Sequence, residues 1–363
     1  MKLKNLSKVL IDRLLLLVIM AIPILAVSQQ TRQIQNPYSS VDWTNHKQYK
    51  ANLHTHTMVS DGWMNPQTVV RKYNEAGYKI LAVTDHWSVT YPWEGFSRFR
   101  AGEKVNQRIK YGILKPQEAE PIAADDTVFM DIRPSDIGMA AIQGNELSFA
   151  EHHMNSFFND DNSNNFNTIF DTVREKGGIM VFNHPGRYRY PAKWYSDLCK
   201  RFDHMVGIEV FNCGNRYPND RRLWDSVLTV MAPVRPVWGF SNDDMHSMRD
   251  FGRNWNVLIL PDLNEQNVRK AMENGIFYFI NAPESHDGPQ PPVISSIAVN
   301  QKKGKITIGA SRYKSIVWIY NGKEIKKGRL FRLRNLPGNN TYIRAELYGA
   351  GNTVVCTQPF FIK

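Results

Sequence analysis

The chain has 363 residues, of which 42% are hydrophobic and 22% are charged, and its formal net charge is +11 at pH 7. This composition is typical of a folded globular protein, and it excludes a collagen-like, disordered or multi-span membrane chain. The length suits one large domain with a small one, or two domains of medium size.

The first 28 residues have the pattern of a secretory signal peptide. Four basic residues precede and flank the apolar run 14–27, and Ala26-Val27-Ser28 matches the small-x-small pattern of cleavage before Gln29. The run is shorter than the roughly 20 residues of a spanning helix. We therefore predict that residues 1–28 are removed, that no stable membrane anchor remains, and that the protein is secreted or periplasmic. An uncleaved anchor is the alternative.

Loss of residues 1–28 removes four basic residues and one Asp, which leaves a net charge of about +8. Such a charge favours acidic substrates in a general way. The sequence contains no long Lys/Arg run and no zinc finger, so no nucleic-acid partner is expected. Three cysteines, Cys199, Cys213 and Cys356, are too few for a disulfide framework, although two of them could form one bridge.

Between residues 50 and 285, short apolar runs alternate with segments of helical periodicity. The runs at 78–84, 178–182, 207–211 and 236–240 predict buried strands. Apolar residues with helical spacing lie between them, at 66–78, 167–177 and 223–228. This alternation predicts an α/β architecture with parallel strands.

The chain changes character after residue 286. Residues 287–292 (DGPQPP) predict a stiff linker, because two adjacent prolines exclude a helix. From Val293 onward β-type residues alternate with polar ones, and Asn321-Gly322 is a hairpin signal. We therefore expect one domain over 29–286 and a small β-sandwich domain over 293–363.

Imidazole and carboxylate groups recur at the predicted C-terminal ends of the strands. His54 and His56 share one face of an extended segment, since residues i and i+2 point the same way. Similar groups follow at 84–86, 144–146, 152–153, 183–185 and 242–246. In a closed parallel barrel these ends converge on one mouth, where mixed nitrogen and oxygen ligands suit Zn²⁺, Mn²⁺ or Fe. One such histidine alone is more often structural, but the ordered set predicts a metal site.

Six motifs resemble, in order, those of the PHP (polymerase and histidinol phosphatase) superfamily: HTHTMVSDG, TDH, GNELS, HHMNSF, NHPG and SNDDMH. The resemblance covers about residues 50–285 and is closest to the extracytoplasmic carbaryl hydrolase-like branch. It implies a distorted (β/α)7 barrel, related to the TIM barrel, over residues 29–286. It also implies a cofactor of two or three divalent metal ions (Zn, Mn or Fe) in the barrel mouth.

Carried over residue by residue, the resemblance assigns nine metal ligands in three sets. The first set is His54, His56 and Asp244, the second is Asp61, His86 and His246, and the third is His153, His184 and Glu146. Glu146 is also expected to bridge to the ion of the first set. Asp61, Glu146 and Asp244 are the carboxylates expected at the catalytic centre, where the ions would activate a water molecule. His153 is preferred to His152, and Asp244 to Asp243, because their spacings match the family pattern. Asp85 is expected to support a ligand instead.

Other residues near the predicted mouth allow two interpretations. Arg187 and Arg216 could bind an anionic group of the substrate, or could be solvated loop residues. Glu209 lies in an apolar strand, where it could face the mouth or pair with an arginine, and we interpret it as structural. Residues 87–141 form an insertion rich in aromatic and basic residues, which could be a substrate lid or wall, or a packed surface subdomain.

The resemblance and the cationic chain together predict a secreted metal-dependent phosphoesterase that cleaves phosphomono- or diesters. Its expected substrate is a small-molecule, glycan-linked or lipid-linked anionic ester. A carboxyl or carbamate ester hydrolase is the first alternative, and a neutral, apolar mouth would favour it over phosphoester hydrolysis. An inactive barrel with a binding β-domain is the second alternative, which the complete ligand set argues against.

Overall fold

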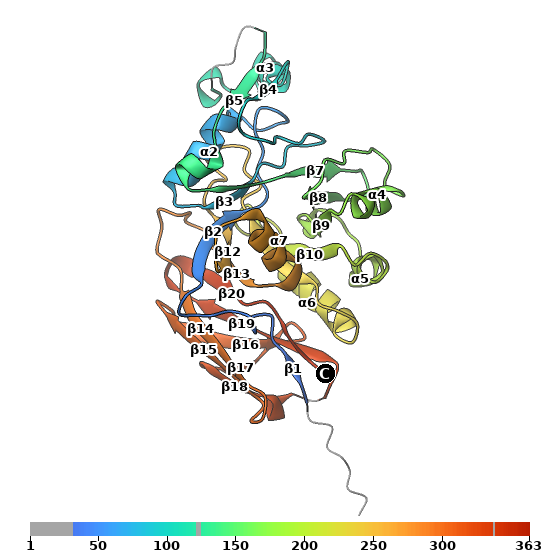
Figure 1. Cartoon of the computed structure of the whole chain (residues 1–363), viewed down its shortest axis with the longest axis vertical. Coiled ribbons are helices and arrows are strands. Elements are labelled where there is room, and N and C mark those ends of the chain that lie inside the picture. Colours follow the sequence, from blue (N-terminus) through green and yellow to red (C-terminus); the bar gives the residue numbers. More distant parts are fainter. Residues whose placement is uncertain (1–31, 121–124, 337) are drawn as a thin grey trace, which may run out of the picture. The chain divides into compact units, whose positions relative to one another are not determined.

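The computed structural model describes residues 32–120, 125–336 and 338–363, so the signal peptide predicted over 1–28 lies outside the described residues. Residues Gln33–Lys363 form one compact unit. This unit has a mixed α/β fold (Figure 1). Within the described part of the chain, no helix has both the length and the apolar character needed to cross a membrane.

The longer helices are α2 (Pro66–Glu75), α3 (Glu103–Lys110), α4 (Ile169–Glu175), α5 (Ala192–Arg201), α6 (Asp220–Met231) and α7 (Glu265–Asn274). Helix α2 begins after Asn65, whose side-chain oxygen accepts a hydrogen bond from the backbone N–H of Gln67. It ends ahead of Gly77, whose φ of +79° is a left-handed conformation that glycine adopts without steric cost. The helix is therefore shorter than the predicted 66–78.

Most strands belong to two large sheets. The first sheet contains β1 (Ile34–Gln35), β2 (Lys47–Asn52), β3 (Ile80–Ala82), β6 (Ala140–Ile142), β12 (Asn254–Leu260), β13 (Phe277–Asn281), β16 (Ser315–Tyr320), β17 (Lys323–Lys327), β19 (Thr341–Tyr348), β20 (Val354–Cys356) and β21 (Phe360–Ile362). The second contains β7 (Gly144–Ser148), β8 (His153–Phe157), β9 (Ile179–Phe182), β10 (Met205–Asn212) and β11 (Trp238–Asn242). Smaller sheets are formed by β14 (Val293–Asn300), β15 (Lys305–Ser311) and β18 (Leu330–Arg332), and by β4 (Phe96–Arg98) and β5 (Val128–Met130).

The predicted strands at 78–84, 178–182, 207–211 and 236–240 are present as β3, β9, β10 and β11. Strands β2, β3 and β6 are parallel to one another, and so are β9, β10 and β11. The expectation of parallel strands is wrong at β8, which runs antiparallel to both β7 and β9, and at β12, which runs antiparallel to β2 and β13. Residues 149–152 join β7 to β8, and this connection is too short for the crossover that a parallel pair needs.

Two isolated bridges connect the first sheet to the second. Thr55, just after β2, pairs in parallel with Met245, just after β11. His86, beyond β3, pairs in parallel with Glu146 of β7. The pairings therefore run in a circuit from β2 through β3, β7, β8, β9, β10 and β11 back to β2. Outside this circuit α4 packs on β9, α5 and α6 pack on β10, and α7 packs on β12 and β6.

Strands of the C-terminal region share a sheet with strands from before the predicted linker. Strand β20 pairs with β13, and the side chain of Gln358 hydrogen-bonds the backbone N–H and C=O of Gly239 in β11. Arg344 of β19 contacts Asp225 of α6 and Glu346, and all three side chains are buried. The predicted hairpin is present, since Asn321-Gly322 joins β16 to β17 with positive φ at both residues. The domain boundary at 287–292 and the sandwich arrangement remain predictions.

Candidate metal centre

All nine side chains predicted as metal ligands lie in one cluster, at the C-terminal ends of the parallel circuit strands and beside the start of the antiparallel strand β8. His54 and His56 follow β2, His86 follows β3, His184 follows β9, and Asp244 and His246 follow β11. Glu146 and His153 face them from β7 and β8, and Asp61 comes from the loop after His56. The cluster is the point at which the two bridges join the sheets.

Within the cluster, four groups of ligand atoms lie close enough to hold a metal ion, with all atoms of a group within 4.8 Å of one another. The groups are His54, His56 and Asp244; His56, Asp61, His86 and His246; His54, Glu146 and His184; and His86, Glu146 and His153. The first group is the first predicted set, and the second group is the second predicted set with His56 added. In the third predicted set, His153 and His184 fall into separate groups that share Glu146.

The Glu146 carboxylate is the centre of the cluster. Its Oε1 lies 3.2 Å from Nδ1 of His153 and 3.2 Å from Nε2 of His184. Its Oε2 lies 2.9 Å from Nδ1 of His86 and 3.4 Å from Nε2 of His56. Because one buried carboxylate contacts imidazoles on both of its oxygens, Glu146 is placed to bridge neighbouring ions.

Charge pairing within the cluster shifts the pKa values of its members. Burial alone would lower the pKa of His86, but the charges of Glu146 and Asp61 outweigh it and raise this pKa to about 10. Burial likewise opposes the effect of Asp61 and Asp244 on His246, whose pKa rises to about 9. Burial alone would raise the pKa of Glu146, but His54 and His86 hold it well below its usual range.

These shifts test whether the cluster fits divalent metal ions. Without metal, protonated imidazoles balance the buried carboxylates. Divalent ions bound by neutral imidazoles and ionised carboxylates would supply the same balancing charge, and they would displace those protons. Mixed nitrogen and oxygen donors in this number suit Zn²⁺, Mn²⁺ or Fe. The residues present therefore fit more than one such ion.

Glu209 faces the cluster, which is the alternative that the sequence interpretation did not prefer. Its Oε1 lies 2.9 Å from Nδ1 of His54, and its Oε2 accepts a hydrogen bond of 2.9 Å from the backbone N–H of His184. The side-chain amide of Asn242 also donates to Oε1. A carboxylate on the far nitrogen of a ligating histidine fixes the ring orientation. The available signal was a single glutamate within the otherwise apolar run GIEVF.

Asp85 holds the loop that carries Asp61. Its carboxylate accepts hydrogen bonds from the backbone N–H and hydroxyl of Thr57, at 2.7 and 2.8 Å, and from the Ser60 hydroxyl at 2.7 Å. The Thr90 hydroxyl donates a further bond of 2.7 Å. Asp85 thereby fixes the chain between His56 and Asp61.

The neighbours of two predicted ligands point away from the cluster. His152 lies with Nε2 3.0 Å from the Tyr195 hydroxyl, in a buried aromatic environment. Asp243 accepts hydrogen bonds from the backbone N–H groups of residues 252–254 and from the Tyr73 hydroxyl. Both side chains serve the packing around the cluster.

Two arginines that the sequence singled out lie near the cluster. Arg216 lies with Nη1 3.1 Å from Oδ2 of Asp244. Arg187 is exposed beside Tyr188, whose hydroxyl accepts a hydrogen bond from the backbone N–H of His153. Burial lowers the pKa of His153, and the charge of Arg187 acts in the same direction. Both candidate substrate-binding arginines therefore lie next to predicted ligands.

A third arginine, Arg108, comes from helix α3 in the 87–141 insertion, and the sequence interpretation did not single it out. Its Nη1 donates a hydrogen bond of 2.9 Å to the backbone oxygen of Asp61, and its Nη2 lies 3.7 Å from Asp61 Oδ2. In the sequence, only the basic composition of the insertion indicated that such a residue could lie near the cluster.

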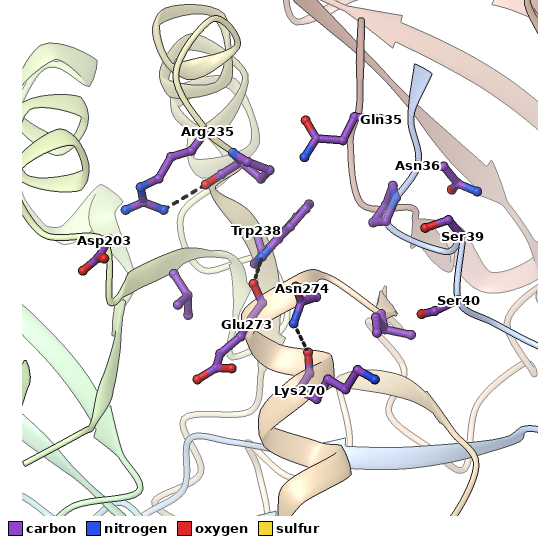
Figure 2. A pocket seen from close by; sticks show the side chains of 14 residues that line it. Gln35, Asn36, Ser39, Ser40, Asp203, Arg235, Trp238, Lys270, Glu273 and Asn274 are labelled. Carbon is purple, nitrogen blue, oxygen red and sulfur yellow. Dashed lines mark hydrogen bonds between the residues drawn. The ribbon is translucent and has the colours of Figure 1, made fainter. Parts of the chain in front are cut away.

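A cavity of about 540 Å³ lies at the other ends of the strands (Figure 2). Its lining includes Asp203 and Val206, where β10 begins, and Trp238, the first residue of β11. Trp238 Nε1 donates a hydrogen bond to the backbone oxygen of Glu273 in α7. The predicted ligands follow the opposite ends of these strands, so this cavity is separate from the metal cluster.

No family model matches the chain. A stretch of 78 residues, which is 21% of the chain, is 33% identical to the 5'-3' exoribonuclease Rnm of Escherichia coli (strain K12). The 5'-3' exoribonuclease Rnm of Salmonella typhimurium (strain LT2) matches over the same length with the same identity. Each match covers 25% of the relative, so the chain spans about a quarter of the length of these curated relatives.

Solved structures with a similar arrangement are distant in sequence. One is a two-domain protein from Bacteroides vulgatus (ATCC 8482) that contains a predicted PHP-like metal-dependent phosphoesterase, with a TM-score of 0.48 and 16% identity over 92% of this chain and 91% of the other. Another is an amidohydrolase from Chromobacterium violaceum, with a TM-score of 0.33 and 15% identity over 55% of this chain and 88% of the other.

Proposed function

We propose that the protein is a metal-dependent phosphoesterase. The observation that carries this proposal is the pairing of the nine-residue ligand cluster with three arginines, Arg108, Arg187 and Arg216, on separate segments around it. Positive side chains beside the ions suit an anionic phosphoryl group, and a neutral carboxyl or carbamate ester does not need them. The stretch similar to an exoribonuclease, an enzyme that cleaves phosphodiesters, agrees with this reaction class.

We also propose that the circuit of strands is the distorted seven-stranded barrel of the PHP superfamily, in the extracytoplasmic branch that the motifs resemble. The strand circuit closed by the Thr55–Met245 and His86–Glu146 bridges supports this fold. The position of most of the cluster at the C-terminal ends of the parallel strands agrees with where barrel enzymes build their active sites.

In this proposal the nine clustered residues hold two or three divalent ions, which lower the pKa of water and polarise a phosphoryl oxygen when bound. Glu209 orients His54, and Asp85 fixes the loop that presents Asp61. Arg216 and Arg187 contribute positive charge at the mouth, where they neutralise and orient the anionic group. The described side chains thus supply ligation, orientation and charge, without a serine or cysteine nucleophile.

The proposal is tested with the purified mature protein after loading with Zn²⁺, Mn²⁺ or Fe²⁺. We expect two to three metal equivalents per chain and hydrolysis of p-nitrophenyl phosphate or bis(p-nitrophenyl) phosphate in preference to p-nitrophenyl acetate. His54→Ala and Asp244→Ala should lose metal and activity while their circular dichroism stays unchanged, and His46→Ala, outside the cluster, should retain both. Preference for acetate would favour the carboxyl ester alternative. Absence of metal after loading would favour the inactive binding protein.

We further propose secretion or periplasmic export through residues 1–28. N-terminal sequencing of the protein from its natural host should begin at Gln29. A chain that retains residues 1–28 would overturn the cleavage proposal and favour an uncleaved anchor.

A further inference from the structure

Arg108 brings a guanidinium from outside the strand circuit to a predicted metal ligand. Its Nη1 hydrogen-bonds the backbone oxygen of Asp61 at 2.9 Å, and its Nη2 lies 3.7 Å from the Asp61 carboxylate. The Arg108 side chain remains 33% exposed. Among the described residues, the hydrogen bond and the ion pair of its side chain are both to Asp61, so most of its five N–H donors are available to another group.

Packing fixes this position. Val105 of α3 belongs to a small apolar cluster with Ala101, Leu114, Val128 and Met58, all of them buried. Met58 lies in the loop between His56 and Asp61, so the insertion and the metal-binding loop share one hydrophobic core.

Two further contacts hold the insertion to the chain directly after Asp61. The Glu120 carboxylate accepts a hydrogen bond of 2.9 Å from the backbone N–H of Asn65, and the Glu120 backbone N–H donates to the Trp63 oxygen. This attachment favours a fixed wall beside the cluster over a hinged lid, and it keeps Arg108 at a set distance from Asp61.

The charge around Arg108 is strongly positive. Between Arg98 and Lys115 the sequence has six basic residues and a single acidic residue, Glu103. A surface segment with this imbalance raises the local concentration of anions. His246 lies between the carboxylates of Asp61 and Asp244. Arg216 contacts Asp244, so each of these two carboxylates has an arginine beside it.

We propose that Arg108 is a specificity-determining residue that binds the anionic group of the substrate at the mouth of the metal centre. This inference rests on the proposed function and adds that the insertion, and not the barrel alone, selects phosphate esters over neutral esters. The Asp61 carboxylate would be neutralised by bound metal, and the Arg108 charge would then be left for the non-bridging oxygens of a phosphoryl group. Its planar N–H donors match two such oxygens.

The test compares Arg108→Gln and Arg108→Lys with Lys104→Gln, which removes one positive charge from an exposed position on the same helix. In metal-loaded Arg108→Gln we expect the dissociation constant of inorganic phosphate, measured by calorimetry, to rise about tenfold or more. The KM for p-nitrophenyl phosphate should rise in parallel, with a smaller change in kcat. Arg108→Lys should recover part of the phosphate affinity, and Lys104→Gln should change it less than about twofold.

Metal content and thermal stability separate binding from a structural role. Both should be unchanged in Arg108→Gln, and loss of metal or of folded protein would overturn the inference in favour of a structural contact to Asp61. Phosphate affinity equal to wild type would also overturn it, while leaving the phosphoesterase proposal intact. If the wild-type protein binds phosphate through Arg108 but hydrolyses no phosphate ester, then the proposed function fails and the anion site stands.

Discussion

Glu209 Oε1 lies 2.9 Å from Nδ1 of His54, on the side of the ring opposite the metal-ligand cluster. The other nitrogen of His54, Nε2, lies 3.3 Å from Asp244 and 3.4 Å from Glu146. Glu209 therefore determines which way the ring presents its ligand atom. Since its second oxygen accepts from the His184 backbone N–H, one carboxylate positions parts of two ligand groups.

Glu209→Gln should weaken metal binding, because a neutral amide orients the His54 ring less firmly and makes it a weaker base. We expect about a 10- to 100-fold loss of affinity for the tightest metal equivalent, measured by competition with a chelator. Glu273→Gln, on the exposed surface of α7, is the matched control and should bind metal as the wild type does. Wild-type affinity in Glu209→Gln would show that the packing of the ring alone is sufficient.

Metal binding should release protons and strengthen as the pH rises. In the metal-free protein the pKa values of His86 and His246 are about 10 and about 9, so both imidazoles hold a proton at pH 7 that a metal ion must displace. Affinity should rise about tenfold per pH unit for each displaced proton, until the pH passes these pKa values. Calorimetric titration with Zn²⁺ in two buffers of different ionisation enthalpy measures the release. Equal apparent heats in the two buffers at pH 7 would contradict this prediction.

Asp220→Asn should stabilise the protein at pH 8. Burial, and then the negative charge of Glu209, raise the pKa of Asp220 from 3.8 to about 8, and the backbone N–H of Gly186 offsets this rise only in part. Between about pH 4 and pH 8 the folded state therefore retains a proton that the unfolded state releases, so stability falls as the pH rises. Asparagine removes this dependence at nearly the same shape.

The expected gain at pH 8 is a few kcal/mol, up to about 5 kcal/mol, and it should vanish near pH 4. Urea unfolding at both pH values measures it. Asp203→Asn, at a residue with an 87% exposed side chain, should change stability by less than about 0.5 kcal/mol. No gain for Asp220→Asn at pH 8 would mean that Asp220 is ionised and paired in the folded protein.

Arg344→Met should destabilise the whole protein. Arg344 donates hydrogen bonds of 2.8 and 2.6 Å to Asp225 of α6 and one of 2.7 Å to Glu346. Its removal leaves two buried carboxylates short of a partner, which costs about 3 to 5 kcal/mol when a buried pair is broken from one side. Chemical denaturation should show a single transition at lower denaturant concentration.

The control for Arg344 is Lys326→Met on the exposed strand β17, which should be nearly neutral. Two separate transitions in Arg344→Met would instead show that the C-terminal strands unfold independently of the circuit strands.

The ligand cluster could be predicted from the sequence because its signals are local. Each ligand lies within a few residues of an apolar run, as His184 does after β9 and His86 does after β3. The rule that parallel strand ends converge predicts a shared metal site, and the resemblance to the PHP superfamily assigned the individual ligands.

Contacts between distant segments could not be predicted in this way. Arg108 reaches Asp61 across 47 positions, and nothing in the metal-binding loop indicates which basic residue of the insertion will face it. The antiparallel direction of β8 was not predicted, because all strands of this region were expected to be parallel. The short connection 149–152 nevertheless indicates a hairpin. Burial of Glu209 beside His54 depends on the β10–β11 pairing, which no local pattern encodes.

The bridges Thr55–Met245 and His86–Glu146 have a consequence for how the protein acquires its activity. Each joins segments far apart in the chain, and such pairings form only after the loop-closure entropy between them has been overcome. Each also lies at, or directly beside, predicted metal ligands. Early folding species with separate, unjoined sheets would therefore have no assembled ion site, and metal capture would report completion of the tertiary structure. Ions bound there would then stabilise the closed circuit of strands against opening.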